Sequence, residues 1–171
     1  MKKPDYGLDA PGVVRGFLFG GPALFAAGYF LVDWAKARNS GRSVGIDLWS
    51  QVDQGNNSRE ATLENAKLEG VADRVEVHDG DMRKLPFPDA SMDAVVANLA
   101  IHNISNREGR REAISEIVRV LKPGGQAALM DFKHVGQYAE DLKKNGIADA
   151  RASGPVFWIF PPVRVARGRK T

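Results

Sequence analysis

The chain of 171 residues contains no cysteine. This absence excludes a disulfide framework and a zinc site built on cysteine ligands. It fits a cytoplasmic protein, although the lack of cysteine does not by itself establish the compartment. None of the three histidines lies at a metal-ligand spacing from another histidine or an acid, so we expect no metal. Repeats and low-complexity segments are absent too, and the length predicts one domain with a core of its own.

A strong charge excess is also missing, because the net charge is only +3. Much of this excess lies in the last residues, "RVARGRKT", which contain Arg164, Arg167, Arg169 and Lys170. A short basic run of this kind is typical of a solvated terminus. We therefore expect no nucleic-acid partner.

One uncharged stretch, residues 16–32, reads "GFLFGGPALFAAGYFLV". Its length is close to the minimum for a bilayer span, roughly 17–25 residues, and it contains helix-breaking glycines and a proline. Two interpretations stay open: a segment that associates with a membrane, or a strand, turn and helix buried in the core. We therefore treat residues 1–42 as an atypical N-terminal segment and residues 43–171 as the domain that carries the ligand site.

Strand and helix patterns alternate from residue 43 onward. This alternation predicts an α/β fold of the Rossmann-like, doubly wound type, with a mostly parallel sheet and helices on both faces. Prolines 155, 161 and 162 are expected to interrupt the C-terminal strands. The expected strands cover residues 43–49, 75–79, 94–99 and 126–132, and the expected helices cover residues 59–70, 107–122 and 136–146.

Polar residues follow these strands, where such sheets bind their ligands. Asp47 is placed to accept hydrogen bonds from a ribose, as acids at this position do in nucleotide-binding domains. Asp81 follows the turn at Gly80 and could accept a hydrogen bond from an exocyclic amine. The backbone N–H of Met82 could donate to a ring nitrogen, so this pair of contacts would select adenine. Asn98 and Asp131 end the next two strands.

The segments "VGIDLW", "VEVHDGDMRKLPFPDASMDAVVANLAIHN", "EIVRVLKPGGQAALMDF" and "YAEDLKKNGIAD" occur in a characteristic order. In this order and spacing the chain resembles the class I S-adenosylmethionine-dependent methyltransferases. The likeness covers residues 43–150 and is closest to the small-molecule branch that includes the ubiquinone and menaquinone biosynthesis enzymes.

The resemblance implies methyl transfer from the cofactor S-adenosyl-L-methionine to a small-molecule acceptor. It assigns Asp47 to the ribose, Asp81 and Met82 to the adenine, and Asn98 and Leu99 to the methionine end of the cofactor. His102 and Asn103 would face the acceptor, and "LKPGG" would be a turn before the fifth strand. His102 is needed as a general base only if the acceptor must first lose a proton.

The chain lacks the glycine-rich loop that the family carries after its first strand. The nearest candidate, "FGGPALFAAG", has adjacent glycines, no preceding acid, and a proline that removes a backbone donor. The family's first strand lies between the second and the fourth, so its loss would leave two strands each without a neighbour on one side. Residues 12–19, "GVVRGFLF", could fill this position.

Two other functions were weighed against methyl transfer. A short-chain NAD(P)-dependent dehydrogenase is disfavoured, because its Tyr-x-x-x-Lys signature would place lysine where Leu142 follows Tyr138. A remnant that binds an adenosyl ligand without turning it over stays open, since the glycine-rich loop is missing.

Overall fold

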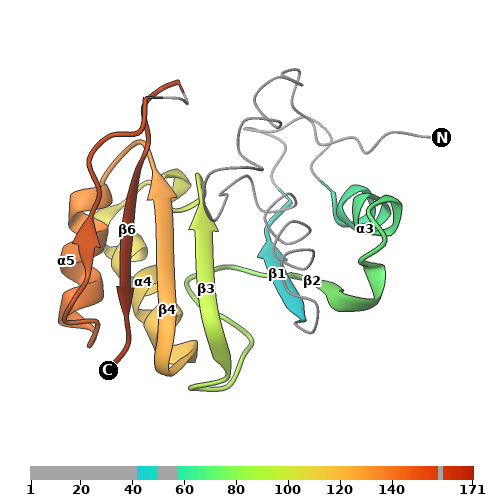
Figure 1. The fold of residues 1–171 in the computed structure, drawn as a ribbon, viewed down its shortest axis with the longest axis horizontal. Helices are drawn as coiled ribbons and strands as arrows, with labels where there is room; N and C mark the ends of the chain where they lie inside the picture. The colour runs from blue at the N-terminus through green and yellow to red at the C-terminus, as the bar shows by residue number, and fades with distance from the viewer. Residues whose placement is uncertain (1–41, 50–57, 158–159) are drawn as a thin grey trace. The chain divides into compact units, whose positions relative to one another are not determined.

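The computed structural model describes residues 42–49, 58–157 and 160–171 (Figure 1). The predictions for the N-terminal segment, including a replacement first strand, the atypical glycine loop and a membrane role for residues 16–32, lie outside these residues. The chain divides into two compact units between Gly80 and Asp81, and each is described by itself. None of the helices in the described ranges has both the length and the apolar composition needed to span a bilayer.

In its described residues, the first unit has a two-stranded parallel sheet and one α-helix. Strand β1 (Ser43–Asp47) pairs in parallel with β2 (Val75–Asp79), and the register places Asp47 beside Asp79. Helix α3 (Arg59–Leu68) starts at Ser58, whose hydroxyl accepts a hydrogen bond from the backbone of Ala61 over 3.1 Å. A short 3₁₀ helix (Ala72–Arg74) follows. The described apolar core consists of four buried side chains: Ala66, Val71, Val75 and Val77.

The second unit is a four-stranded sheet with the order β3-β4-β6-β5 (Figure 1). Strands β3 and β4 are parallel, and β6 is antiparallel to both of its neighbours. Helices α4 and α5 share one hydrophobic core with this sheet. The bounds are β3 (Met92–Asn98), a 3₁₀ helix (Ile101–Asn103), α4 (Arg107–Val120), β4 (Leu121–Asp131), α5 (Val135–Lys144), β5 (Arg151–Ala152) and β6 (Arg164–Arg169).

The apolar stripe predicted for α4 is confirmed, since Ala113 is buried and Ile114, Ile117 and Val118 are buried in that core. The predicted end of the helix is wrong. Strand β4 begins at Leu121, directly after the helix, so "LKPGG" lies within β4 and not in a turn before it. The fully buried Leu121 pairs with Met92, and the ladder is then interrupted until Gln126 pairs with Ala94. The bulged residues include Gly124, whose φ of +78° favours glycine.

The charge of the C-terminal residues predicted a solvated terminus, and this prediction is wrong. Residues 164–169 form β6, which pairs with β4 on one side and β5 on the other. The strands expected on either side of prolines 155, 161 and 162 are confirmed. Ala166 is completely buried in the sheet, while the arginines at 164, 167 and 169 remain exposed.

Strands β1 and β3 each lie at the edge of their sheet. Within the described ranges β1 pairs only with β2, and β3 pairs only with β4. These are the two strands that flank the first strand in the fold that the sequence resembles. The division between the units also falls inside residues 43–171, which the sequence suggested as one domain.

Candidate functional site

Asp47 lies at the carboxyl end of β1, as predicted, and its carboxylate is held by the next loop. The backbone N–H of Trp49 donates to Asp47 Oδ1 over 2.7 Å. The indole Nε1–H of the same tryptophan donates to Asp79 Oδ1 over 2.6 Å. Trp49 therefore donates hydrogen bonds to two neighbouring carboxylates at the carboxyl ends of β1 and β2. The sequence located Asp47 but did not indicate the roles of Asp79 and Trp49.

Gly80 follows β2 and lies close to the side chain of Ile46. A Cβ atom at this position would lie 3.1 Å from the Cγ2 atom of Ile46, which is tighter than ordinary packing. The backbone N–H of Gly80 also donates to the carbonyl of Asp47 over 3.1 Å. A larger residue here would require the Ile46 side chain to move by a few tenths of an ångström, so the close approach favours glycine.

Asp81 begins the second unit and pairs with an arginine two residues later. Arg83 Nε lies 3.0 Å from Asp81 Oδ1 and 2.9 Å from Oδ2, and the backbone N–H of Arg83 donates to Oδ1 over 2.9 Å. These hydrogen bonds lower the pKa of Asp81 below its ordinary value. The side chain of Met82 packs against the core of its unit. A ligand amine at Asp81 would therefore share the carboxylate with Arg83, a partner that the sequence did not reveal.

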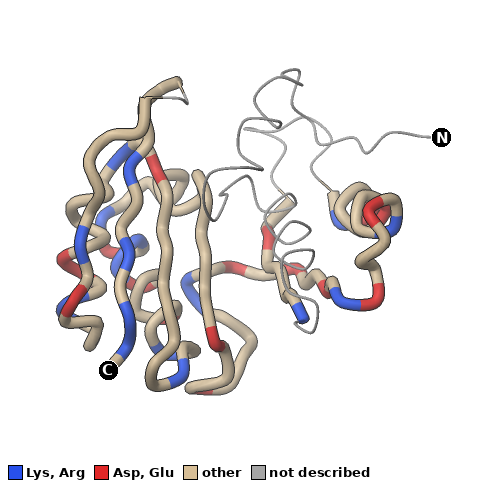
Figure 2. Tube along the Cα trace, viewed as in Figure 1, with Lys and Arg blue, Asp and Glu red and all other residues tan. Residues whose placement is uncertain are grey.

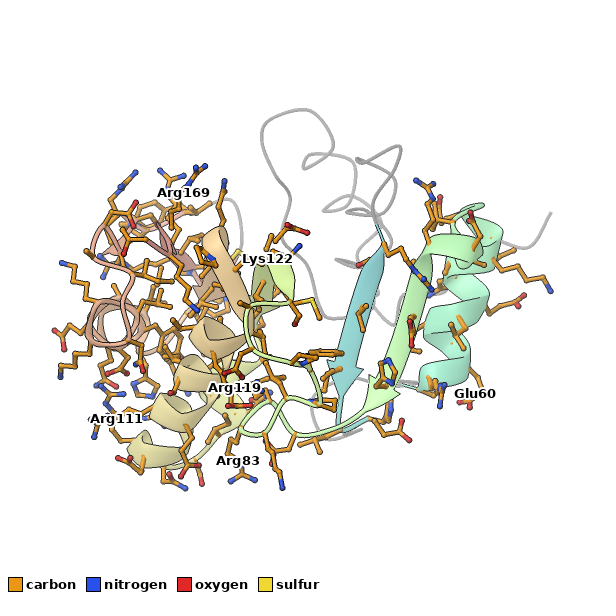
Figure 3. The ribbon with its side chains drawn as sticks, turned by 90° about the horizontal axis from the view of Figure 1, so that it is seen from below. Glu60, Arg83, Arg111, Arg119, Lys122 and Arg169 are labelled. Atoms are coloured by element: carbon orange, nitrogen blue, oxygen red, sulfur yellow. The ribbon has the colours of Figure 1, made fainter. Side chains whose placement is uncertain are left out.

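The loop that follows is tied to α4 by Arg119 and Glu116. Arg119 donates to the carbonyl oxygens of Leu85 (3.0 Å) and Phe87 (2.8 Å) and to the carboxylate of Asp89 (2.6 Å). It also binds Glu116 through Nε and Nη2 at 2.6 and 2.8 Å. Glu116 in turn accepts from the backbone of Leu85 over 2.8 Å. Figure 3 shows Arg119 near this loop.

Asn98 ends β3 with its side-chain amide buried and unpaired. The residue is 6% exposed, and neither Oδ1 nor Nδ2 has a hydrogen-bond partner within the described residues. Side chains alternate along a strand, so Asn98 lies on the face opposite the core residues Val95 and Ala97. The next residue, Leu99, has a φ of +49° and donates to the carbonyl of Met130 over 2.9 Å. A buried amide without partners is costly unless a ligand supplies them.

His102 lies beside Asp131, the fully buried acid at the end of β4. The backbone N–H of His102 donates to Asp131 Oδ2 over 3.1 Å. The ring Nδ1 is 2.9 Å from Oδ1, but the direction of its N–H does not meet the geometry of a hydrogen bond. The imidazole also packs against the ring of Phe132, with centroids 4.4 Å apart. Asp131 thus orients the loop that carries His102.

Asp131 accepts further hydrogen bonds, among them one of 3.5 Å from the backbone N–H of Lys133 to Oδ1. The backbone N–H of Phe132 donates to Oδ1 over 2.8 Å, and the hydroxyl of Tyr138 donates to Oδ2 over 3.2 Å. Burial and the neighbouring carboxylate raise the pKa of Tyr138 far above its ordinary value, so the phenol stays a neutral donor. The sequence placed Asp131 at a strand end without a role. The sequence did contain one indication of a role for Asp131, because a carboxylate at the end of an otherwise apolar strand needs hydrogen-bond partners when it is buried.

The structure therefore brings His102 next to Asp131, and Asp47 next to Asp79. Asp81 and Met82 are consecutive, and Asp81 is paired with Arg83. In the described residues no group of three or more histidines and acids is arranged to hold a metal ion.

Comparison with known proteins adds a family and a fold. The methyltransferase domain family matches residues 25–129. The ubiquinone/menaquinone biosynthesis C-methyltransferase UbiE of Pseudomonas putida strain GB-1 is 40% identical over 63 residues, which cover 37% of this chain and 23% of the relative. The protein of the same name from Brucella anthropi is 39% identical over 72 residues, which cover 42% and 26%. The matched region thus spans a minor part of these relatives.

Solved structures match over most of the chain. The cyclase SpnF has a TM-score of 0.67 at 18% identity, with 92% of this chain and 79% of that chain covered. YcgJ of Bacillus subtilis gives 0.59 at 17%, with 84% and 88% covered. PigF, solved with SAH, gives 0.61 at 15%, with 85% and 48% covered. These likenesses confirm the predicted Rossmann-like α/β fold, while the name of SpnF illustrates that this fold alone does not define a reaction.

Proposed function

Because this chain belongs to the methyltransferase domain family, we propose that it transfers a methyl group from S-adenosyl-L-methionine to a small molecule. The names of the relatives support this proposal, since the UbiE proteins are C-methyltransferases. One structural neighbour was solved with SAH, the demethylated form of that cofactor. The relatives are matched over about a quarter of their length, so the acceptor is proposed only as a small molecule.

The observation that carries the proposal is the unpaired amide of Asn98. Its carbonyl can accept a hydrogen bond and its NH₂ group can donate two. The methionine end of the cofactor offers both partners, an ammonium donor and a carboxylate acceptor. We assign Asn98 and Leu99 to this end, Asp81 and Met82 to the adenine, and Asp47 to the ribose. When bound, the cofactor supplies an electrophilic methyl group on a sulfonium.

The protein's contribution to such a displacement is mainly to hold two reactants in line, which requires no catalytic triad. His102 is our candidate for the acceptor side. Nδ1 lies 2.9 Å from Asp131 Oδ1, so Nε2 is the nitrogen that remains for accepting a proton from an acceptor that must lose one.

The alternative is a protein that binds an adenosyl ligand without turnover. Calorimetry with S-adenosylhomocysteine should detect binding in either case. Only the enzyme should accumulate S-adenosylhomocysteine when it is incubated with S-adenosylmethionine and a set of candidate acceptors. Hydroquinones are the first acceptors to test, because the named relatives act in quinone biosynthesis. Binding without product across the set would favour the alternative.

Asp81→Ala is expected to weaken S-adenosylhomocysteine binding about tenfold or more, since a hydrogen bond to a charged group contributes roughly 1.5–3 kcal/mol. Arg83→Ala should leave the affinity unchanged or raise it, because it frees the carboxylate with which Arg83 now pairs. Titration calorimetry measures both effects. If Asp81→Ala binds as well as the parent, the assignment of this residue to the adenine is wrong.

Asn98→Leu is expected to weaken binding of the cofactor product without lowering the free energy of unfolding. An apolar side chain of similar shape removes an amide that has no partner, so the free energy of unfolding should stay equal or rise by about 1 kcal/mol. Binding of S-adenosylhomocysteine should weaken roughly tenfold, as measured by calorimetry. Asn103→Leu is the matched control, because Asn103 is exposed and is assigned to the acceptor side. A destabilised variant that retains full affinity would contradict the proposed role of Asn98.

A further inference from the structure

The connection between β5 and β6 presents exposed aromatic side chains. Phe157 is 74% exposed and Phe160 is 94% exposed, and they are two of the most exposed large apolar residues described. Side chains of this size rarely stay in water without a function when several occur together. The aromatic pair therefore requires an explanation that the fold of the unit does not supply.

The aromatic residues sit on a regular support. Val156 and Val163 exchange two backbone hydrogen bonds of 2.7 and 3.3 Å, which close the two arms of the connection just below its tip. We call the described residues of this connection, 156–157 and 160–163, the hairpin tip. In Figure 1 it extends beyond the arrowheads of β3 and β4, the strand ends that carry Asn98 and Asp131. The tip therefore projects from the candidate-site edge of its unit.

Exposed arginines lie on the two strands directly behind the hairpin tip. Arg151 and Arg167 occupy opposite positions in the ladder of β5 and β6, and Arg164 starts β6 and donates to the carbonyl of Ser153 over 2.9 Å. Figure 2 shows this concentration of positive charge along the two strands. Like charges in direct register repel each other unless an anion lies nearby. Within the described part of the chain none of the three arginines forms an ion pair with an acid.

We propose that the hairpin tip docks on a lipid bilayer that contains anionic headgroups. Phe157 and Phe160 would enter the interface, and Arg151, Arg164 and Arg167 would bind lipid phosphates. Exposed apolar side chains next to basic side chains bind such surfaces, because the free energies of apolar burial and of electrostatic attraction add together. The proposal rests on none of residues 16–32 and does not depend on methyl transfer.

The test is cosedimentation of the full chain with two kinds of vesicle. One contains phosphatidylcholine alone, and the other contains equal parts of phosphatidylcholine and phosphatidylglycerol. The parent should bind the anionic vesicles and bind the neutral ones more weakly. Phe157→Ser with Phe160→Ser should reduce the partition coefficient about tenfold or more, since a transfer free energy of roughly 1.4 kcal/mol corresponds to tenfold. Arg151→Gln, Arg164→Gln and Arg167→Gln together should remove the preference for anionic vesicles.

Two controls match these variants. Leu63→Ser with Leu68→Ser removes two exposed apolar side chains on α3, and Lys143→Gln with Lys144→Gln removes two charges on α5. Neither should change binding, and unchanged thermal unfolding of the hairpin variants verifies their fold. A parent that binds neither vesicle, or a serine variant that binds like the parent, overturns the proposal. So does a parent that forms dimers which the serine variant dissociates, because the tip would then be an interface between copies.

Discussion

Asp131→Ala is expected to lower the free energy of unfolding by roughly 3–5 kcal/mol, one of the largest losses available to a single substitution in this chain. The carboxylate is fully buried and accepts hydrogen bonds from the backbone of His102 and Phe132 and from the hydroxyl of Tyr138. Alanine would leave the buried hydroxyl of Tyr138 and two part-buried backbone N–H groups without an acceptor, and a buried orphaned group costs about 1–3 kcal/mol. Urea denaturation followed by circular dichroism measures the loss.

Tyr138→Phe provides the matched comparison. Alone it removes one donor and leaves Asp131 with its backbone partners, so the expected loss is about 1 kcal/mol. In the Asp131→Ala background the same substitution should cost less or even restore stability, because the orphaned hydroxyl disappears. This coupling is the signature of the hydrogen bond. Strictly additive effects, or an Asp131→Ala protein as stable as the parent, would show that the network does not hold this end of the sheet.

Arg119→Ala is expected to lower the free energy of unfolding by about 2 kcal/mol and to loosen the loop after Met82. One guanidinium binds two backbone carbonyls, Asp89 and Glu116. Arg119→Lys should recover little of the loss, since an ammonium cannot reproduce the planar fork. Arg111→Ala is the control on the same helix. Its exposed ion pair with Glu108 is expected to contribute less than about 0.5 kcal/mol.

Arg119→Ala should also change how the free energy of unfolding depends on pH. Hydrogen bonds from Arg119 lower the pKa of Glu116 below its ordinary value of 4.5. A carboxylate whose pKa is lowered by folding stabilises the protein above the ordinary pKa, and this contribution is lost as the pH falls through the lower folded value. In the Arg119→Ala protein the pKa should return toward the ordinary range, so stability should depend less on pH there. A parallel pH dependence in both proteins would contradict the pairing.

Patterns with a regular period were predictable from the sequence. The alternation at Val75 and Val77 and the apolar stripe of α4 gave the correct elements, because burial selects side chains on one face. Asp47 and Asn98 were located correctly at strand ends. The roles assigned to these residues, and to Asp81, Met82, Leu99 and His102, stay predictions.

Long-range partners were not predictable. Arg119 binds the loop more than 30 positions before it, and His102 contacts Asp131 29 positions away. No local pattern indicates such pairs, since they depend on how the elements pack. The start of β4 was missed for a related reason. Leu121 is buried and pairs with Met92 in the ladder, and this tertiary contact outweighs the preference of proline and glycine for turns. A strand after Pro162 was expected from the sequence, but its place between β4 and β5 was not, because strand pairing depends on how the elements pack.

The indole of Trp49 gives the protein an intrinsic optical reporter. The hydrogen bond from its Nε1–H to Asp79 links the emission of the ring to the surroundings of the acids at the end of β1 and β2. A ribose hydroxyl that reached Asp47 would alter the surroundings of this fluorophore. With Trp34 and Trp158 replaced by phenylalanine, the remaining signal would follow occupancy of that edge without any added label.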